Sequence, residues 1–175
     1  NDGALATGGF GTVLGVIRVA HKRGNVEMVY VDETRPLLRG ARLTTYELMA
    51  DGIPVTLVID SAAAALMGQH KVDLILVGCD RMAANGDFTH TTGTYGLAIS
   101  AYYHGIPFYA VLPSSSVDLS VNSGKEIAIE ERDPAEVTHC AGAATAPAGT
   151  GVWNPALDMT PNQLLTGIVT EKGVI

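Results

Sequence analysis

The chain has 175 residues, of which 47% are hydrophobic and 17% are charged, enough to fill the core of one α/β domain of ordinary size. A formal net charge of -7 at pH 7 argues against nucleic acid as the main partner, and two cysteines are too few for a disulfide framework. No segment resembles a signal peptide or a membrane span, so we expect a cytoplasmic protein, with the nucleus as an alternative if the source is eukaryotic.

Helices and strands are predicted to alternate along the first two thirds of the chain. Apolar periodicity predicts helices over Phe10–Arg23, Thr44–Ala50, Ala62–Met67 and Gly93–His104, with Asp60-Ser61 as the N-cap of the third. Strands are predicted over Val26–Val31, Val55–Ile59, Leu74–Val77 and Phe108–Leu112. After Pro113 the pattern loosens, and we predict a half-exposed strand at Glu126–Glu130, a loop over Thr138–Gly151, a short helix from Thr160 and a strand near Ile168-Val169.

Four alternations with short links are typical of an α/β fold, here a Rossmann-like, doubly wound, mostly parallel sheet with helices on both faces. The chain opens on Asn1 rather than Met. We therefore interpret the chain as a fragment of a longer protein.

The strongest candidate for chemistry is Asp80, which follows the continuous apolar strand Leu74–Val77. In doubly wound sheets, ligands bind beyond the carboxyl ends of the strands. A carboxylate there, flanked by apolar residues, can have a raised pKa and serve as a general acid or base. The alternative is a structural partner for Arg81. The turn signal Asn85-Gly86-Asp87 could bend the chain back over this site.

Candidate anion-binding groups lie in three further places. Asp32-Glu-Thr-Arg35 ends the first strand and is either a structural salt-bridge corner or part of a substrate site. Arg39 and Arg42 follow closely, and the three guanidinium groups suit an anion such as a sugar phosphate. The run from Thr89 to Thr94 precedes a helix, where amides and hydroxyls either bind an anion or cap the helix. Gly8–Thr12 also opens a helix, with phosphate binding and close helix packing as alternatives. His139 and Cys140 lack a second ligand pair, so we predict no metal site.

Several motifs together resemble the methylthioribose-1-phosphate isomerase family. They run in the right order over nearly the whole chain, and the related regulatory subunits of the translation-initiation guanine-nucleotide exchange factor match them less well. The quoted segments are Gly3-Ala-Leu-Ala-Thr7, Val31-Asp-Glu-Thr-Arg-Pro36, Gly40-Ala-Arg-Leu-Thr44, Asp60-Ser-Ala-Ala63, Gly78-Cys-Asp-Arg-Met-Ala-Ala-Asn-Gly-Asp87, Gly93-Thr-Tyr95, His104-Gly-Ile-Pro-Phe-Tyr109, Gly124-Lys-Glu-Ile127, Trp153-Asn-Pro-Ala-Leu-Asp-Met-Thr-Pro161 and Ile168-Val-Thr-Glu-Lys-Gly173.

The resemblance implies isomerisation of 5-methylthioribose 1-phosphate to its ketose in methionine salvage, without a cofactor. It also implies a homodimer and an N-terminal helical domain outside this chain, so that residues 1–175 are one Rossmann-like catalytic domain, the C-terminal part of a longer protein. A catalytic cysteine is implied immediately before Asn1. Asp80 matches the family's proton donor, and we expect Asn85 to orient the substrate or Asp80. Cys79 is not the catalytic cysteine, because it lies where relatives carry a small residue.

Three substrate-pocket positions depart from the family pattern. Position 39 is Arg instead of the usual Gln, and His90 and Thr91 replace an Asn-Lys pair that holds substrate. Our hypothesis is that Arg39 partly replaces the lost lysine charge, with the Gly93 helix N-terminus supplying backbone donors. The predicted site is therefore Asp80 as the catalytic residue, with Arg39, Asn85, His90 and Thr91 in the substrate pocket.

Two other functions remain open at this stage. A non-catalytic regulatory subunit is favoured by the altered positions 39, 90 and 91, whereas Asp80 and Ala84–Asp87 favour the enzyme. An isomerase acting on ribose 1,5-bisphosphate is the second alternative, because Arg39 could bind a second phosphate.

Overall fold

The computed structural model describes residues 2–175; Asn1, the first residue of the predicted domain, lies outside the described residues. The α-helices are α1 (Ala4–Thr7), α2 (Val13–Lys22), α3 (Thr45–Ala50), α4 (Ala63–Gly68), α5 (Thr94–His104) and α6 (Ala135–Thr138). The strands are β1 (Val29–Glu33), β2 (Val55–Ile59), β3 (Ile75–Val77), β4 (Arg81–Ala83), β5 (Phe88–Thr91), β6 (Phe108–Val111), β7 (Val117–Asp118), β8 (His139–Cys140), β9 (Ala143–Ala144), β10 (Leu157–Thr160), β11 (Gly167–Thr170) and β12 (Gly173–Val174). Within residues 2–175, no helix combines the length and the apolar character that crossing a bilayer requires.

Parallel strand pairs form the centre of the molecule, as the sequence predicts. β1 pairs with β2, and β6 lies between β3 and β11, all in parallel register. β12 adds an antiparallel edge to the second group. The fold is therefore a mixed α/β structure with parallel strands, whose two parallel groups form separate sheets.

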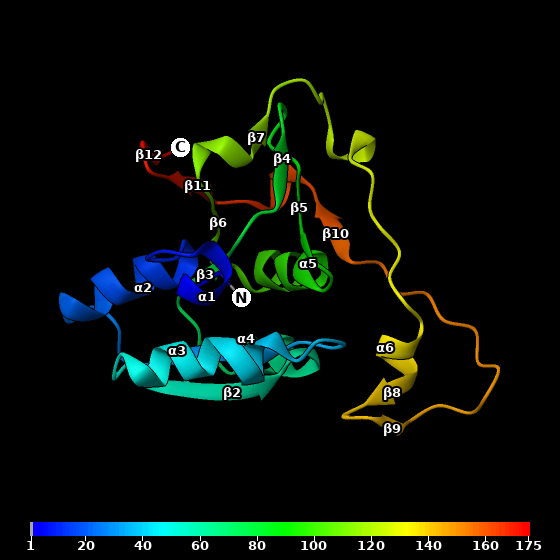
Figure 1. The fold of residues 1–175 in the computed structure, drawn as a ribbon. Coiled ribbons are helices and arrows are strands. Elements are labelled where there is room, and N and C mark those ends of the chain that lie inside the picture. The colour runs from blue at the N-terminus through cyan, green and yellow to red at the C-terminus, as the bar shows by residue number, and fades with distance from the viewer. Residues whose placement is uncertain (1) are drawn as a thin grey trace.

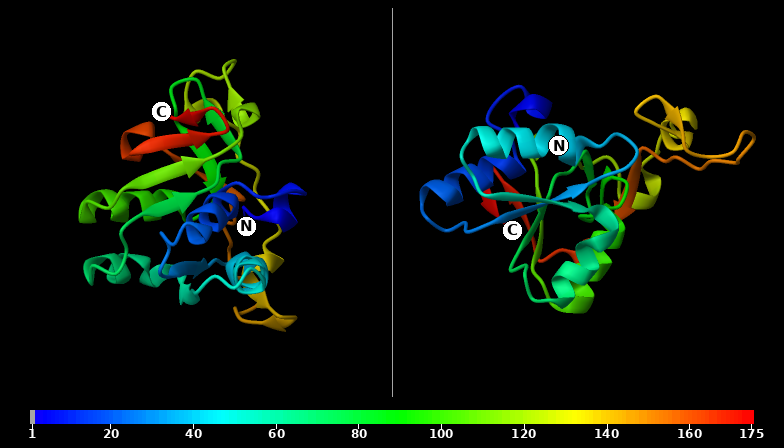
Figure 2. Two further views of the ribbon diagram at one scale, coloured as in Figure 1. Left: turned by 90° about the vertical axis from the view of Figure 1, so that its left-hand side faces the viewer. Right: turned by 90° about the horizontal axis from the view of Figure 1, so that it is seen from below.

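Two apolar clusters hold the helices against these strands. One joins α2 and α3 to β1 through Leu14, Leu48 and Val31. The other joins α4 and α5 to β3 and β6, and its largest side chains include Phe88 and Phe108. Seen from below in Figure 2, α2 and α3 lie on one side of the strands, and α4 and α5 on the other.

The link from helix to strand has the same geometry at both predicted Gly-Ile-Pro turns. Gly52 and Gly105 adopt left-handed φ angles of 69° and 68°. The following amides of Ile53 and Ile106 donate back to the carbonyls of Leu48 and Ala101, each at 2.9 Å. Glycine suits these positions because a side chain disfavours positive φ, and the bonds satisfy carbonyls at the helix ends.

A third sheet carries the β4–β5 hairpin, which the sequence indicates only through its turn. Its strand order is β10-β5-β4-β7, and β4 and β10 both run antiparallel to β5. In Figure 1 the hairpin rises away from the helices, with its tip at the top of the molecule. The turn Asn85–Asp87 is thus confirmed, but it points away from the carboxyl end of β3 instead of folding back over it.

Five predicted local features differ from the structure. Glu126–Glu130 is not a strand, because Gly124–Glu126 forms a 3-10 turn and the nearest pairing in the described chain is the single bridge Glu131–Pro155. The first helix begins at Val13 rather than Phe10, and Asp60-Ser61 lies inside a 3-10 turn rather than capping α4. The loop over Thr138–Gly151 contains the short β8–β9 hairpin, and the helix expected from Thr160 is a 3-10 turn at Asn162–Leu164.

Asp32 near the end of β1 gives a prediction about stability. Burial, together with the nearby Asp60 carboxylate, raises the pKa of Asp32 to about 6. Because this lies above the value of 3.8 for a free side chain, the contribution of Asp32 to stability is fully present below pH 3.8 and is lost as pH rises through 6. We expect Asp32→Asn to stabilise the full-length protein at pH 7 by at most about 3 kcal/mol, from about two pKa units. Urea unfolding at pH 7 and pH 4 measures this, and an equal effect at both pH values would contradict it.

Candidate active site

Asp80 lies in the short segment between β3 and β4, at the carboxyl end of the parallel strand. Its backbone amide donates to the Thr89 carbonyl at 2.9 Å, which fixes the segment against β5. Its side chain is 50% exposed. The alternative that Asp80 pairs with Arg81 is wrong, because the Arg81 Nε donates to Asp118 Oδ2 at 3.0 Å. Asp80 therefore has a carboxylate open to a ligand.

His90 on β5 lies between two carboxylates. Its Nδ1 is 2.8 Å from Asp80 Oδ2, and its Nε2 is 3.4 Å from Asp2 Oδ2. Burial alone would lower the pKa of His90, but the hydrogen bonds and negative charges of Asp2 and Asp80 outweigh burial and raise it to about 9. Because this pKa lies above 7, His90 is an imidazolium at neutral pH. An imidazolium can donate from both nitrogens at once.

The segment that follows Asp2 is anchored by the buried carboxylate of Glu47. Glu47 accepts hydrogen bonds from the amides of Ala4 at 2.7 Å and Leu5 at 3.1 Å, and from Arg18 Nη2 at 2.8 Å. A Cβ on Gly78 would lie 2.2 Å from Asp2 Oδ1, so the glycine at the end of β3 leaves room for this carboxylate. Burial raises the pKa of Asp2, but the hydrogen bond and charge of His90 and the charge of Arg39 bring it below its ordinary value.

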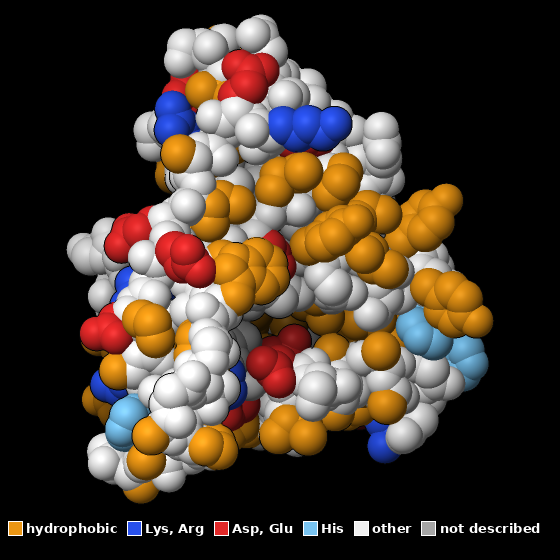
Figure 3. Space-filling view, turned by 90° about the vertical axis from the view of Figure 1, so that its right-hand side faces the viewer, with side chains coloured by type: hydrophobic (Ala, Val, Ile, Leu, Met, Phe, Trp, Pro, Cys, Tyr) orange, Lys and Arg blue, Asp and Glu red, His pale blue; other side chains and the backbone are white. Residues whose placement is uncertain are grey.

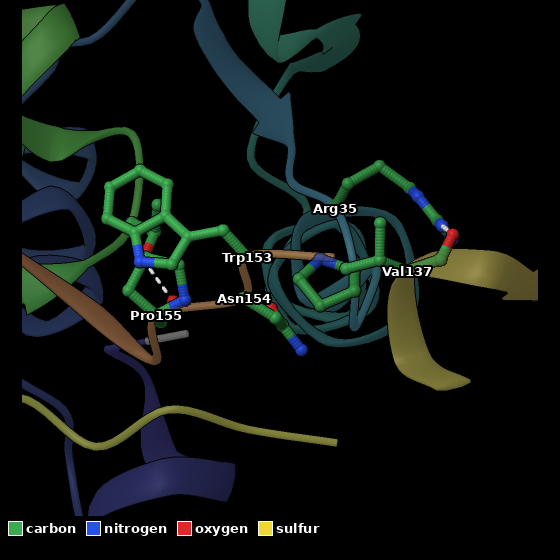
Figure 4. Close-up of a pocket in the computed structure, with 7 residues that line it drawn as sticks. Arg35, Val137, Trp153, Asn154 and Pro155 are labelled. Carbon is green, nitrogen blue, oxygen red and sulfur yellow. Dashed lines mark hydrogen bonds between the residues drawn. The ribbon is translucent and has the colours of Figure 1, made fainter. Parts of the chain in front are cut away.

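Of the three arginines predicted near the anion, Arg39 is the one that reaches this site. Its Nη2 donates to Thr91 Oγ1 at 2.9 Å. Arg35 instead donates to backbone carbonyls at the end of α6, with Val137 O at 2.8 Å, and Figure 4 shows its guanidinium turned toward Val137. Arg42 donates to the Leu37 carbonyl at 3.4 Å. The salt-bridge-corner alternative is wrong for Arg35, because its recorded partners are backbone carbonyls and not carboxylates.

The N-terminus of α5 already binds an anionic side chain. The amides of Gly93 and Tyr95 donate to the two oxygens of Asp158, at 2.7 and 3.1 Å. Burial raises the pKa of Asp158 above its ordinary value, although these two hydrogen bonds and the His90 charge act against it. A phosphate could therefore use these donors only by displacing the Asp158 carboxylate.

Asn85 lies at the opposite end of the hairpin from Asp80 and His90. Its Nδ2 donates to Asp87 Oδ2 at 2.9 Å, and its Oδ1 accepts from the Asp87 amide at 3.0 Å. These bonds close the turn between β4 and β5. The side chain thus orients Asp87 rather than Asp80, and a contact of Asn85 with substrate stays a prediction.

A shallow pocket of about 180 Å³ adjoins the end of β5. It is lined by Arg35, Pro36, Thr92, Val137, Trp153, Asn154 and Pro155 (Figure 4). A neighbouring pocket of about 420 Å³ shares Arg35 and extends to His139 and Cys140. On this face, hydrophobic side chains surround a hollow with acidic groups at its edge (Figure 3). Asp80 and His90 line neither pocket, and residues 2–175 contain no group of three His, Cys, Asp or Glu placed to hold a metal.

Asp2 and Asp158 are the site residues that the sequence did not reveal. Asp2 is a single charge beside a run of small residues, and nothing in its spacing from His90 predicts an ion pair 88 positions apart. Asp158 belongs to the Trp153–Pro161 family motif, and this motif could have indicated that Asp158 is a site residue. Its partner, β5, was not predicted as a strand, so the pairing of Asp158 with His90 across β10 and β5 was missed.

Comparison with known proteins places this geometry in a family. The sequence model of the Initiation factor 2 subunit family matches residues 2–175. A methylthioribose-1-phosphate isomerase from Desulforamulus reducens is 57% identical over 175 residues, which are 100% of this chain and 51% of that protein. The chain spans about half the length of the curated relatives it matches.

Two solved structures have the same fold. The 5-methylthioribose 1-phosphate isomerase from Pyrococcus horikoshii OT3 is 53% identical with a TM-score of 0.98, over 100% of this chain and 49% of that one. The translation initiation factor eIF-2B subunit delta from A. fulgidus is 42% identical with a TM-score of 0.96, over 100% and 51%. The chain therefore belongs to the Initiation factor 2 subunit family.

Proposed function

We propose that the full-length protein isomerises 5-methylthioribose 1-phosphate to 5-methylthioribulose 1-phosphate in methionine salvage. The observation that carries this proposal is the half-exposed Asp80 carboxylate at the end of β3, in the position of the proton donor that the resemblance implies. Identity of 57% to a relative named for this activity supports it.

The chemistry requires a proton at one oxygen and a hydrogen at one carbon. The 1-phosphate blocks spontaneous ring opening, so Asp80 protonates the ring oxygen and the ring opens. Hydrogen then moves from C2 to C1, and the C2 hydroxyl gives up its proton as the ketone forms. Because the oxidation of C2 and the reduction of C1 occur within one molecule, the reaction balances without a metal or redox cofactor.

Arg39 and Thr91 are proposed to bind the phosphate. The guanidinium supplies the charge that a lysine supplies in the family. It donates to Thr91, and its charge acts on Asp2, the carboxylate that pairs with His90. His90 is proposed to lie beside the substrate through its contact with Asp80, whereas Asn85 could contact the substrate only if the ligand reaches the far end of the hairpin.

Arg39→Gln in the full-length protein should raise KM for the sugar phosphate about 10- to 100-fold, as expected for loss of a charged hydrogen bond. Steady-state kinetics measure this, and Arg35→Gln is a matched control because Arg35 donates to α6 carbonyls. We expect KM of the control to stay within threefold. An unchanged KM in Arg39→Gln would show that the arginine does not replace the lysine.

The rest of the protein is proposed from the same resemblance. Residues 1–175 would form the catalytic domain, Rossmann-like and doubly wound, after an N-terminal helical domain. The parallel strand pairs, each packed against helices through its own apolar cluster, support this arrangement. We propose a cytoplasmic homodimer that binds no nucleic acid, and the exposed rings of Tyr102 and Tyr103 on α5 offer apolar surface for a subunit contact.

A regulatory subunit is the second candidate function. The eIF-2B subunit delta from A. fulgidus, with a TM-score of 0.96, favours it, as do the altered positions 39, 90 and 91. The residue that precedes Asn1 in the gene separates the two, because the enzyme requires cysteine there. An isomerase of ribose 1,5-bisphosphate is the remaining alternative, which Arg39 could suit by binding a second phosphate.

A further inference from the structure

We propose that His90 and Asp80 act as one acid–base pair, in which His90 stores the proton that Asp80 delivers to the substrate. The proposal rests on the proposed isomerase function and adds a positioning residue to it. The resemblance does not imply this role, because the family carries Asn at position 90.

The contacts of the His90 imidazole allow it to hold a proton and to pass it to Asp80. His90 Nδ1 is 2.8 Å from Asp80 Oδ2, so a proton can pass directly between the two side chains. The His90 side chain is 12% exposed while that of Asp80 is 50% exposed, so His90 reaches the substrate through Asp80. Asp2 Oδ2, 3.4 Å from Nε2, holds the other side of the ring and favours its charged form.

The charged groups that act on His90 among the described residues are mainly carboxylates. Asp2 and Asp80 contact the ring, Asp158 faces it from β10, and Arg39 acts on it indirectly by lowering the pKa of Asp2. Burial raises the pKa of Cys79 to about 12, so this neighbour stays a neutral thiol. The carboxylates dominate, which agrees with the raised pKa of His90, about 9.

The proton balance closes over one turnover. The N–H bond at His90 Nδ1 breaks as the proton passes through the Asp80 carboxyl to the ring oxygen, where an O–H bond forms and the ring C–O bond breaks. His90 is then neutral. After hydrogen has moved from C2 to C1, the O–H bond of the C2 hydroxyl breaks, and its proton returns through Asp80 to Nδ1. The pair ends as it began, and no oxidant or reductant is consumed.

The pH dependence of kcat in the full-length protein tests this role. With wild type and 5-methylthioribose 1-phosphate, we expect kcat to fall above about pH 9, as His90 loses its proton. Asp2→Asn removes one of the two carboxylates that stabilise the imidazolium. The alkaline limb of the pH profile, where kcat falls, should therefore shift to lower pH by at least one unit. His90→Asn should lower kcat at pH 8 at least tenfold and remove the limb. A merely structural role of His90 or Asp2 would change the size of kcat but not the position of the limb.

Titration of histidine side chains by NMR measures the protonation of His90 directly in the same proteins. We expect the His90 ring, assigned by its absence in His90→Asn, to be protonated at pH 7.5 and to titrate at lower pH in Asp2→Asn. A neutral ring at pH 7.5 would overturn the proposal, as would an active Asp2→Asn protein with an unmoved limb. Wild type that is inactive while His90 titrates as expected would instead refute the isomerase function, and the catalytic role with it.

Discussion

Asp80→Asn in the full-length protein is expected to reduce kcat about 10²- to 10⁴-fold, the range for loss of a positioned acid or base. The amide cannot deliver a proton to the ring oxygen, so ring opening becomes limiting. The side chain is 50% exposed and its hydrogen bond is to His90, so the fold should survive the change. Steady-state rates and circular dichroism measure the two effects separately.

Asp118→Asn is the matched control for this variant. Asp118 is a carboxylate on β7, in the same sheet as the hairpin, and its partners are Arg81 and Ser120. It has no contact with His90 or Arg39, so kcat should stay within about twofold. Residual activity above a tenth of wild type in Asp80→Asn would refute the role of Asp80, provided that the control behaves as expected.

Gly40→Ala is expected to destabilise the protein by about 3 kcal/mol or more, at the upper end for an overpacked core site. Gly40 opens the π-helical turn Gly40–Thr44, directly after Arg39. A Cβ on it would lie 1.9 Å from the carbonyl oxygen of Asp32, and a backbone atom of β1 cannot move aside as a side chain can. The turn must shift, and Arg39 with it, so KM for the sugar phosphate should also rise.

Gly96→Ala provides the comparison for glycine removal. Gly96 lies within α5 and a Cβ on it would meet no atom within 4 Å. Alanine favours helix over glycine by about 1 kcal/mol, so this variant should be as stable as wild type or slightly more stable. Urea unfolding of both variants measures the contrast, and equal stability of Gly40→Ala and Gly96→Ala would contradict the close packing of the turn against β1.

The parallel α/β core could be predicted because its signals are local. Continuous apolar strands and the Gly-Ile-Pro turns at Gly52 and Gly105 specify each element within a few residues. The β4–β5 hairpin was missed because Arg81–Ala83 and Phe88–Thr91 are short, and β4 and β5 gain their remaining partners from β7 and β10, far along the chain. The prediction of a strand at Glu126–Glu130 was wrong because an alternating pattern forms a strand only when a neighbouring strand is present to pair with it.

The sequence predicts those site residues whose positions are set by a single local segment. Asp80 could be placed by the strand that precedes it, and His90 by the motif that precedes α5. The contacts of His90 could not be predicted, because Asp2 and Asp158 approach it from the N-terminal segment and from β10. Of Arg35, Arg39 and Arg42, the sequence gives no reason why Arg39 alone turns toward Thr91, because α6, which engages Arg35, lies about a hundred positions away.

The most direct test is to incubate the purified full-length protein with 5-methylthioribose 1-phosphate and to follow the ketose product by NMR. The account predicts conversion to 5-methylthioribulose 1-phosphate by wild type, and conversion at least a hundredfold slower by Asp80→Asn. Failure of wild type to form the ketose, under conditions in which the isomerase from Pyrococcus horikoshii forms it, would contradict the account.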